Sequence, residues 1–254
     1  MYAEERQQAI AEWVSRHGRA AVTQLADRFD VTPETVRRDL DRLEEHGLVR
    51  RVHGGAVPAT AITVLETDVD SRQHEQAEQK QRIAARAVAL LPSGGSIVLD
   101  AGTTTSRLLD GHRPDEELTV VTNSIPIALR LTQHEGVNLT MVGGRVRGTT
   151  HAVVGPEAVA HLAGLRVDVA FLGTNGLTEG FGASTPDPDE AAAKTAMVDA
   201  AHQVVVLADA TKLGREHLHR FARPDQVDVL VTDTDANPAR VAALETAGIT
   251  VVLA

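Results

Sequence analysis

The sequence predicts an α/β protein in two parts, a small helical N-terminal domain that ends in a β-hairpin and a larger domain built on a Rossmann-like, largely parallel sheet. Two observations predict this division. Apolar residues recur at helical spacing through residues 1–46 and give way to a glycine-containing, partly alternating segment. From residue 96 onward, continuous Val, Leu and Ile runs alternate with amphipathic helical stretches, which is typical of a parallel sheet covered on both faces.

The first part contains three predicted helices. The first spans about residues 3–17 and ends at Gly18, and the second spans about residues 22–29. The third begins at Thr32, which can cap it, and at Pro33, which suits the first helical position, and it ends near residue 46. The partly alternating residues 48–57, with their Gly-Gly turn, predict a short hairpin.

Polar and basic side chains gather on the third helix and on the hairpin. Two short helices joined by a tight turn, with Arg and Thr on the second, are typical of a helix-turn-helix that enters the major groove, and the hairpin would be its wing. There Arg can pair with guanine edges or phosphates. The candidate DNA-binding residues are Thr32, Glu34, Thr35, Arg37, Arg38, Arg42, Arg50, Arg51 and His53. The alternative is a small helical bundle whose arginines are solvated, but the Arg-Arg-Val-His-Gly-Gly run serves no evident packing purpose.

Net charge does not support DNA binding by itself. The chain carries a formal charge of −10, and residues 1–57 hold nine Arg against ten Asp and Glu. Affinity for nucleic acid depends on Lys and Arg that neutralise phosphates. A single head would therefore bind weakly, and we expect a homo-oligomer, a dimer or a tetramer, on double-stranded operator DNA.

Composition excludes several other classes of protein. The absence of cysteine excludes a disulfide scaffold, a thiolate zinc site and a cysteine nucleophile. No run approaches the roughly 20 apolar residues of a membrane span, and the N-terminus has no signal-peptide pattern, so we expect a cytoplasmic protein without a membrane partner. His217 and His219 are the closest pair of histidines, and their spacing alone is a weak zinc signal, so no metal is expected.

Residues 58–77 are polar and have no clean period, so they are expected to link the two domains, which gives a head at 1–57 and a larger domain at 78–254. A helix is predicted over about 76–91. The predicted strands lie at 96–100, 118–122, 138–142, 167–172, 204–208, 227–232 and 250–253, with helices at 125–133, 188–202 and 238–247.

Polar residues follow several of these strands, at the edge where parallel sheets bind ligands. After the first strand, Asp100 and Gly102 precede a run of threonines whose hydroxyls and backbone N–H groups could hold a phosphate. The alternative is a strand–turn–helix with ordinary threonine caps. No Gly-Lys-Ser/Thr follows, so this is not a nucleotide-hydrolysing loop. The small and hydrogen-bonding residues after the other strands suggest a polyol or phosphate pocket.

Two further features have both a ligand-binding and a structural explanation. Arg145 and Arg147 could balance a phosphate or be solvated loop residues. Glu190 and Lys194 begin a helix four residues apart, which fits an ordinary surface pair as well as a ligand-facing pair.

The residues from Val31 to Leu40, followed by Leu43-Glu44 and by Arg51 to Ala56, resemble the signature of the DeoR family of bacterial repressors. The resemblance continues through Leu99–Thr105, Val121–Ser124, Gly143-Gly144, Phe171–Gly176, Glu190–Lys194 and Asp209–Gly214. It implies an effector domain similar in fold to ribose-5-phosphate isomerase and glucosamine-6-phosphate deaminase, which would bind a phosphorylated sugar effector.

By this resemblance, phosphate would be bound by Asp100, Gly102, Thr103, Thr104 and Thr105. The sugar would meet Asn123, Asn175, Lys194 and Lys212, and Gly143, Gly144 and Arg145 complete the expected effector site. Within the family the chain is most similar to fructose-operon repressors of actinobacteria, so fructose 1-phosphate is the first expected effector.

An isomerase or deaminase is the competing hypothesis. Such reactions need a positioned carboxylate or histidine to move a proton, and Asp100, Asp189 and Glu190 are candidates. Turn and capping roles explain the placement of these acids equally well. The attached DNA-binding head favours a sensor, so no catalytic residue and no cofactor are expected.

Overall fold

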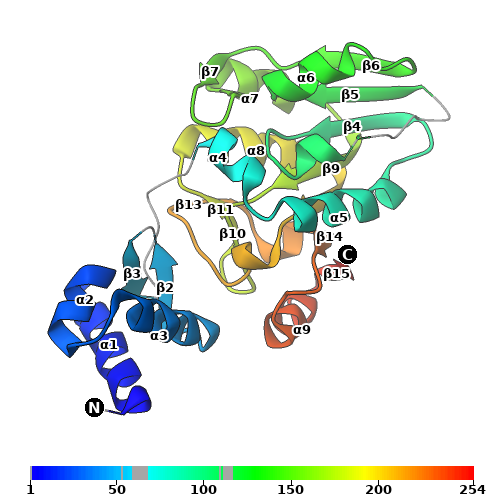
Figure 1. Ribbon diagram of the computed structural model, residues 1–254. Coiled ribbons are helices and arrows are strands. Elements are labelled where there is room, and N and C mark those ends of the chain that lie inside the picture. Colours follow the sequence, from blue (N-terminus) through cyan, green and yellow to red (C-terminus); the bar gives the residue numbers. More distant parts are fainter. Residues whose placement is uncertain (1, 53, 59–67, 109, 111–116) are drawn as a thin grey trace. The chain divides into compact units, whose positions relative to one another are not determined.

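The computed structural model describes residues 2–52, 54–58, 68–108, 110 and 117–254. The chain divides into two compact units, residues 1–62 and residues 63–254, whose elements are labelled in Figure 1.

The first unit is a three-helix domain with a small antiparallel sheet. Its elements are α1 (Ala3–His17), β1 (Ala20–Ala21), α2 (Val22–Phe29), α3 (Pro33–Glu45), β2 (Val49–Val52) and β3 (Gly55–Pro58). The strand order is β1-β3-β2. The three predicted helices and the hairpin are confirmed, with ends that differ by a residue.

Local signals in the sequence explain how these helices begin and end. Thr32 caps α3, because its hydroxyl accepts a hydrogen bond from the backbone N–H of Thr35 at 3.2 Å, and Pro33 occupies the first turn. Gly18 ends α1 in the left-handed conformation, at φ 74°. The apolar faces of the helices meet in one core that includes Ile10, Val14, Leu25, Val36, Leu40, Leu43 and Val49.

The second unit is built on a seven-stranded sheet. Its strands are β4 (Gly95–Leu99), β5 (Leu118–Thr122), β6 (Val137–Met141), β9 (Val167–Gly173), β12 (Ala201–Leu207), β14 (Val229–Thr232) and β15 (Thr250–Leu253). They lie in the order β15-β14-β12-β9-β4-β5-β6, and every neighbouring pair is parallel. The predicted parallel sheet is confirmed. From β4 the chain first adds strands on one side and then returns to add them on the other, so the strand order reverses between β4 and β9.

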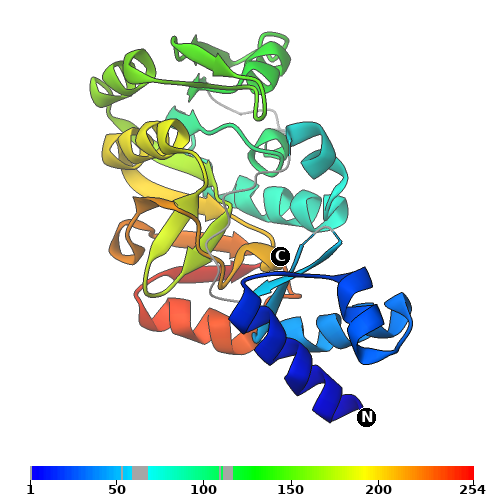
Figure 2. The ribbon, with the colours of Figure 1, turned by 90° about the vertical axis from the view of Figure 1, so that its left-hand side faces the viewer.

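Helices cover both faces of this sheet (Figures 1 and 2). They are α5 (Ala77–Ala87), α6 (Ile125–Leu131), α7 (Pro156–Ala163), α8 (Pro188–Ala200) and α9 (Pro238–Thr246). Alternate residues of β4 divide the core: Val98 packs in a cluster with α7 and α8, whereas Ile97 and Leu99 pack in a second cluster with α5 and α6. None of the described helices combines the length and apolar character that crossing a membrane requires.

The helix predicted over 76–91 is α5 followed by the 3₁₀ turn η1 (Val88–Leu90). The sequence did not predict several short elements. They are β1, α4 (Val69–His74), β7 (Arg145–Arg147), β8 (Ala152–Val154), α7, β10 (Gly176–Thr178), β11 (Gly182–Thr185), β13 (His219–Ala222) and the single turns η2 (Thr105–Arg107), η3 (Ala210–Lys212) and η4 (Pro224–Gln226). Most are too short to show a period.

Two of these differences affect the site. Part of the expected linker is the helix α4, which Asp68 caps by accepting a hydrogen bond from the backbone N–H of Ser71 at 2.8 Å. The helix expected after Gly102 is only the single 3₁₀ turn η2, so a phosphate there would meet a loop and not the end of a long helix.

Candidate functional site

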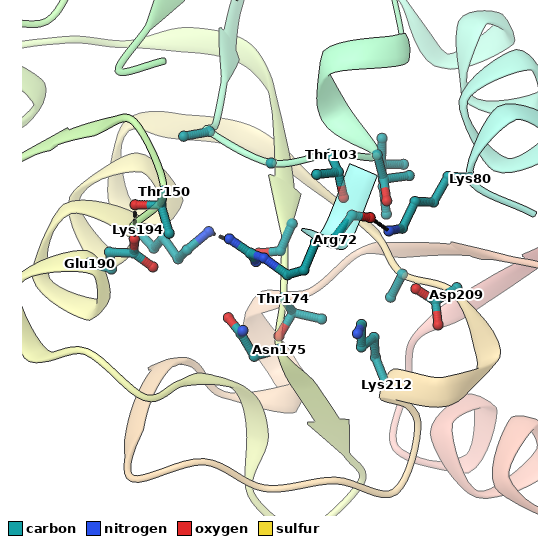
Figure 3. A pocket seen from close by; sticks show the side chains of 16 residues that line it. Arg72, Lys80, Thr103, Thr150, Thr174, Asn175, Glu190, Lys194, Asp209 and Lys212 are labelled. Carbon is teal, nitrogen blue, oxygen red and sulfur yellow. Dashed lines mark hydrogen bonds between the residues drawn. The ribbon is translucent and has the colours of Figure 1, made fainter. Parts of the chain in front are cut away.

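A pocket lies beyond the carboxyl ends of three adjacent strands of the large sheet (Figure 3). Residues 101–104 follow β4, residues 173–175 extend from the end of β9, and residues 207–209 end β12. The pocket therefore lies at the point where the strand order reverses, which is where open α/β sheets bind ligands. The space within its outline, open solvent included, is about 510 Å³.

Half of the predicted effector residues line this pocket: Gly102, Thr103, Thr104, Asn175, Lys194 and Lys212. The other half do not: Asp100, Thr105, Asn123, Gly143, Gly144 and Arg145.

Asp100 lies behind the pocket and holds one of its cations. The ammonium group of Lys194 donates hydrogen bonds to the Asp100 carboxylate and, at 3.0 Å, to the carbonyl of Gly173. The backbone N–H of Gly173 also donates to Asp100 at 3.0 Å. Burial raises the pKa of Asp100, and the charge of Lys194 opposes that rise. Because this carboxylate is 1% exposed and paired, its geometry suits the placement of Lys194 and not direct contact with a phosphate.

Asn123 and Thr105 shape the loop that follows β4. The Asn123 amide accepts from the backbone N–H of Ala101 at 2.9 Å and donates to the carbonyl of Val153 at 3.2 Å. The Thr105 hydroxyl donates to the carbonyl of Asp100 at 2.7 Å. Both side chains are buried, and their polar groups are hydrogen-bonded to the backbone, so they support the pocket loop without facing the pocket.

The β6–β7 connection also lies outside the pocket. Gly143 and Gly144 precede β7, where Arg145 is largely exposed and pairs with Asp189. Arg147 is mostly buried and reaches Asp187 at 3.0 Å and Glu190 at 3.2 Å. Arg147 therefore supports the acidic residue that faces the pocket, and Arg145 stays at the surface.

Two cations of the pocket come from residues that sequence reasoning did not select, Arg72 of α4 and Lys80 of α5. Lys80 lies with Lys212 and Asp209 at one end, and Arg72 lies between that end and Lys194. Lys80 is 3% exposed, its Nζ atom lies 2.5 Å from the carbonyl oxygen of Arg72, and burial lowers its pKa to about 8. Burial also lowers the pKa of Lys212. The sequence held a signal for Lys80, because it lies on the buried helical stripe of Ile83, Ala84 and Ala87.

The other end carries a fixed hydrogen-bond acceptor. The Glu190 carboxylate accepts from Thr150 Oγ1 at 2.5 Å, from Arg147 at 3.2 Å and from Thr185 Oγ1 at 3.4 Å. Figure 3 shows Glu190, Thr150 and Lys194 on one side and Thr103, Lys80, Asp209 and Lys212 on the other, with Arg72 between them. Each end of the pocket therefore combines a cation with a carboxylate: Lys194 lies beside Glu190, and Lys80 and Lys212 lie beside Asp209.

The first unit presents its predicted DNA-contacting residues mainly on α3. Thr32, Glu34, Arg37, Arg38 and Arg42 are exposed, and Thr35 is half-buried. Arg37 pairs with Glu34 at 3.1 Å, whereas Arg38 and Arg42 have no ion-pair partner among the described residues.

The hairpin is less available than expected. Arg50 is 7% exposed in β2, so its side chain packs within the unit and does not extend from the wing. Arg51 pairs with Asp41 of α3, and its backbone N–H donates to Glu44 at 2.9 Å. His53 lies outside the described residues.

A buried ion pair fixes α3 to α1. Arg6 Nε lies 2.6 Å from the carboxylate of Asp39, and Gln7 donates to the same carboxylate at 2.9 Å. The hydrogen bond to Asp39 also raises the pKa of Arg6. It holds the exposed face of α3 in a fixed orientation on the first unit.

The described residues include no group of three His, Asp or Glu side chains arranged to hold a metal ion. The backbone N–H of His217 donates to Ser184 at 3.0 Å and its ring faces the carbonyl of Asn175 at 3.2 Å, which gives it a place in the packing beside the pocket.

Comparison with known protein families matches both units. Residues 6–61 match the DeoR-like helix-turn-helix domain, and residues 75–234 match the DeoR C terminal sensor domain. The regulator GlpR of Haloferax volcanii is 38% identical over 98% of this chain and 96% of its own length. The repressor GlcR of Bacillus subtilis is 32% identical over 94% and 92%, and the glycerol-3-phosphate regulon repressor of Escherichia coli is 29% identical over 90% of each chain.

Among solved structures, ribose 5-phosphate isomerase A of Methanocaldococcus jannaschii aligns with 55% of each chain, with 23% sequence identity and a TM-score of 0.40. A likeness of that strength carries no argument about function. The two family matches, together with the similarity along nearly the whole length of the regulators, show that this chain belongs to the DeoR family of transcriptional regulators.

Proposed function

We propose that the chain is a transcriptional repressor of a sugar-utilisation operon, whose first unit binds double-stranded operator DNA and whose second unit binds a phosphorylated sugar that relieves repression. The observation that carries this proposal is the pocket at the strand ends, where four cationic side chains lie close to the threonine loop after β4. The end at Lys80 and Lys212 suits a phosphate, and the end at Glu190 offers groups that suit sugar hydroxyls.

The phosphate is placed at Arg72, Lys80 and Lys212, with Thr103 and Thr104 on the loop after β4. Burial disfavours the charged forms of Lys80 and Lys212, and the nearby charge of Asp209 offsets this only in part. A phosphate dianion would reverse that effect, and it would accept charge-assisted hydrogen bonds from both ammonium groups and from the Arg72 guanidinium.

The hydroxyl groups of the ligand are placed at the opposite end. Glu190 is held by three donors and can accept from a hydroxyl, while Asn175 and Lys194 can donate to one. Resemblance of the sequence to fructose-operon repressors makes fructose 1-phosphate the first candidate. The name of the Escherichia coli relative makes glycerol 3-phosphate the second.

Operator binding is placed on α3, where Arg38 and Arg42 are exposed and Thr32 and Glu34 lie beside them. Because residues 1–57 are nearly neutral in charge, one head makes few phosphate contacts. We therefore propose that a dimer or a tetramer presents two or more heads to repeated half-sites, in the cytoplasm where the chromosome lies.

The competing proposal, an isomerase or deaminase, needs an acid free to move a proton. Asp100 is paired with Lys194, Glu190 accepts from three donors, and Asp209 caps η3 by accepting from the backbone N–H of Thr211 at 3.1 Å. These engagements favour a sensor. Steady conversion of a sugar phosphate, followed by NMR, would overturn that preference.

A thermal-shift screen of the full chain tests the proposal. The panel holds fructose 1-phosphate, glycerol 3-phosphate, the matching unphosphorylated sugars and inorganic phosphate. A specific ligand at about 100 times its dissociation constant stabilises the folded chain by about 2.7 kcal/mol. We expect such a shift from one sugar phosphate and not from its unphosphorylated form. Equal shifts from both members of a pair would contradict the phosphate site.

A further inference from the structure

Helix α4 connects the pocket to the part of the chain that leads from the DNA-binding unit. It spans Val69–His74 and follows residues 59–67 in the sequence. Arg72 of this helix lines the pocket, and every other lining residue lies at position 80 or beyond. Arg72 is therefore the pocket residue nearest in sequence to the DNA-binding unit.

At least three hydrogen bonds attach α4 to other described parts of the sensor unit. The donors and acceptors are Val69 N to Thr149 O at 2.9 Å, Lys80 Nζ to Arg72 O at 2.5 Å, and Arg107 Nη2 to Gln73 O at 3.1 Å. They anchor the first turn, the middle and the last turn of this six-residue helix.

Each anchor is a pocket residue or adjoins one. Lys80 lines the pocket itself, and Thr149 precedes the lining residue Thr150, whose hydroxyl donates to Glu190. Arg107 ends η2, the turn that follows Thr103 and Thr104. A ligand in the pocket therefore contacts one support of α4, Lys80, and lies near the segments that carry the other two.

A bound phosphate would add contacts that exist only in the occupied state. The Arg72 guanidinium would bind the phosphate from α4, and Lys80 would bind it while still donating to the Arg72 carbonyl, because an ammonium group has three donors. A ligand can shift a conformational equilibrium only through such differential contacts.

We propose that α4 transmits occupancy of the pocket to the DNA-binding unit. When the phosphate binds, Arg72 and Lys80 fix α4 on the sensor unit, and the chain leading to the DNA-binding unit is fixed at its end, which lowers the affinity for operator DNA. This inference rests on the proposed function of the pocket and adds the route by which the pocket acts.

The variant Arg107→Gln separates this route from ligand binding. Arg107 does not line the pocket, yet its side chain holds the last turn of α4. Arg82→Gln is the matched control, since Arg82 is exposed on α5 and forms no hydrogen bond or ion pair with α4 among the described residues. Both substitutions remove one positive charge from the same region.

The test measures two affinities of the full chain, one for fructose 1-phosphate or glycerol 3-phosphate and one for a duplex that the full chain selects from a random library. In the wild type and in Arg82→Gln, saturating sugar phosphate should weaken duplex binding by a factor of about 5–150, the usual range of allosteric coupling. In Arg107→Gln, the affinity for sugar phosphate should be unchanged and the coupling factor should fall toward 1.

A wild-type coupling factor in Arg107→Gln would overturn the inference and leave the proposed function intact. If no sugar phosphate binds the wild type, the proposed function fails, and the inference fails with it. Should Arg107→Gln fold poorly, hydrogen exchange of the wild type decides. Saturating ligand should slow exchange of the Val69 amide and leave amides of α9 unchanged; slowed exchange in the loop at 102–106 without any change in α4 would overturn the inference.

Discussion

The ammonium group of Lys194, on α8, is hydrogen-bonded to the carboxylate of Asp100, at the end of β4, and the two side chains are only 6% and 1% exposed. Removing one partner of such a pair leaves an unpaired buried charge. Lys194→Met should therefore lower the free energy of unfolding by about 3–5 kcal/mol in urea titration.

Two variants make that measurement specific to the pair. Asp100→Asn in the Lys194→Met background should recover part of the loss, because it removes the uncompensated charge. Lys212→Met, at a half-buried pocket lysine, should retain wild-type stability or exceed it, since burial already disfavours the charge of Lys212. Equal losses in Lys194→Met and Lys212→Met would show that Asp100 does not depend on Lys194.

The affinity of the pocket for a phosphate ligand should fall as the pH rises above about 8. Burial lowers the pKa of Lys80 from 10.5 to about 8, so its charge is lost in this range. A phosphate monoester stays a dianion there, because its second pKa is about 6. Binding must then restore the proton on Lys80, which raises the dissociation constant by up to about tenfold per pH unit.

Calorimetric titration from about pH 7 to about pH 9 measures this slope, and Lys80→Met should flatten it. Stability has the opposite sign. Since the folded pKa of Lys80 is lowered, the unfolded chain binds more protons between about 8 and 10.5, and the free energy of unfolding should rise with pH across that window. A dissociation constant that is flat in the wild type would remove Lys80 from the phosphate site.

Arg38→Ala should weaken operator binding and leave the fold intact. Arg38 is exposed on α3 and has no ion-pair partner among the described residues. Loss of a base contact should cost about 1–3 kcal/mol of binding, and loss of a phosphate contact should reduce the salt slope by about 1. Anisotropy titrations at several salt concentrations distinguish these two roles. Arg50→Ala should instead destabilise the first unit, because Arg50 is buried; unaltered operator affinity in Arg38→Ala would contradict the assigned face.

Much of the site's framework was predictable, because strand ends in a parallel sheet meet at one edge. The runs at β4, β9 and β12 could be read from the sequence, and Thr103, Thr104 and Asn175 at their ends do meet in one pocket. What the sequence could not show is which polar groups are already used. Asn123 follows a strand as Asn175 does, yet both the oxygen and the nitrogen of its amide are hydrogen-bonded to backbone groups.

The pocket residues Arg72 and Lys80 were missed for a different reason. Arg72 lies on a six-residue helix, which is too short to show a period, and only tertiary packing brings it to the pocket. Lys80 lies on a buried helical stripe, but a lysine there also fits a solvated end of the helix. The burial of Arg50 was missed for a similar reason, because alternation in a four-residue strand does not reveal which face is covered.

Thr104→Arg should abolish the response to the effector and spare DNA binding. Thr104 is 7% exposed and lines the pocket, so an arginine there would fill the space assigned to the phosphate. Thr246→Arg, on the exposed end of α9, is the matched control.

The most direct test of the account is therefore release of the selected duplex by fructose 1-phosphate or glycerol 3-phosphate, followed by fluorescence anisotropy for the wild type, Thr246→Arg and Thr104→Arg. We expect release of the first two proteins by one of the sugar phosphates, no release by the unphosphorylated sugar, and an unresponsive Thr104→Arg that still binds the duplex. Release of Thr104→Arg at the same sugar phosphate concentration as the wild type would contradict the phosphate site at the loop after β4.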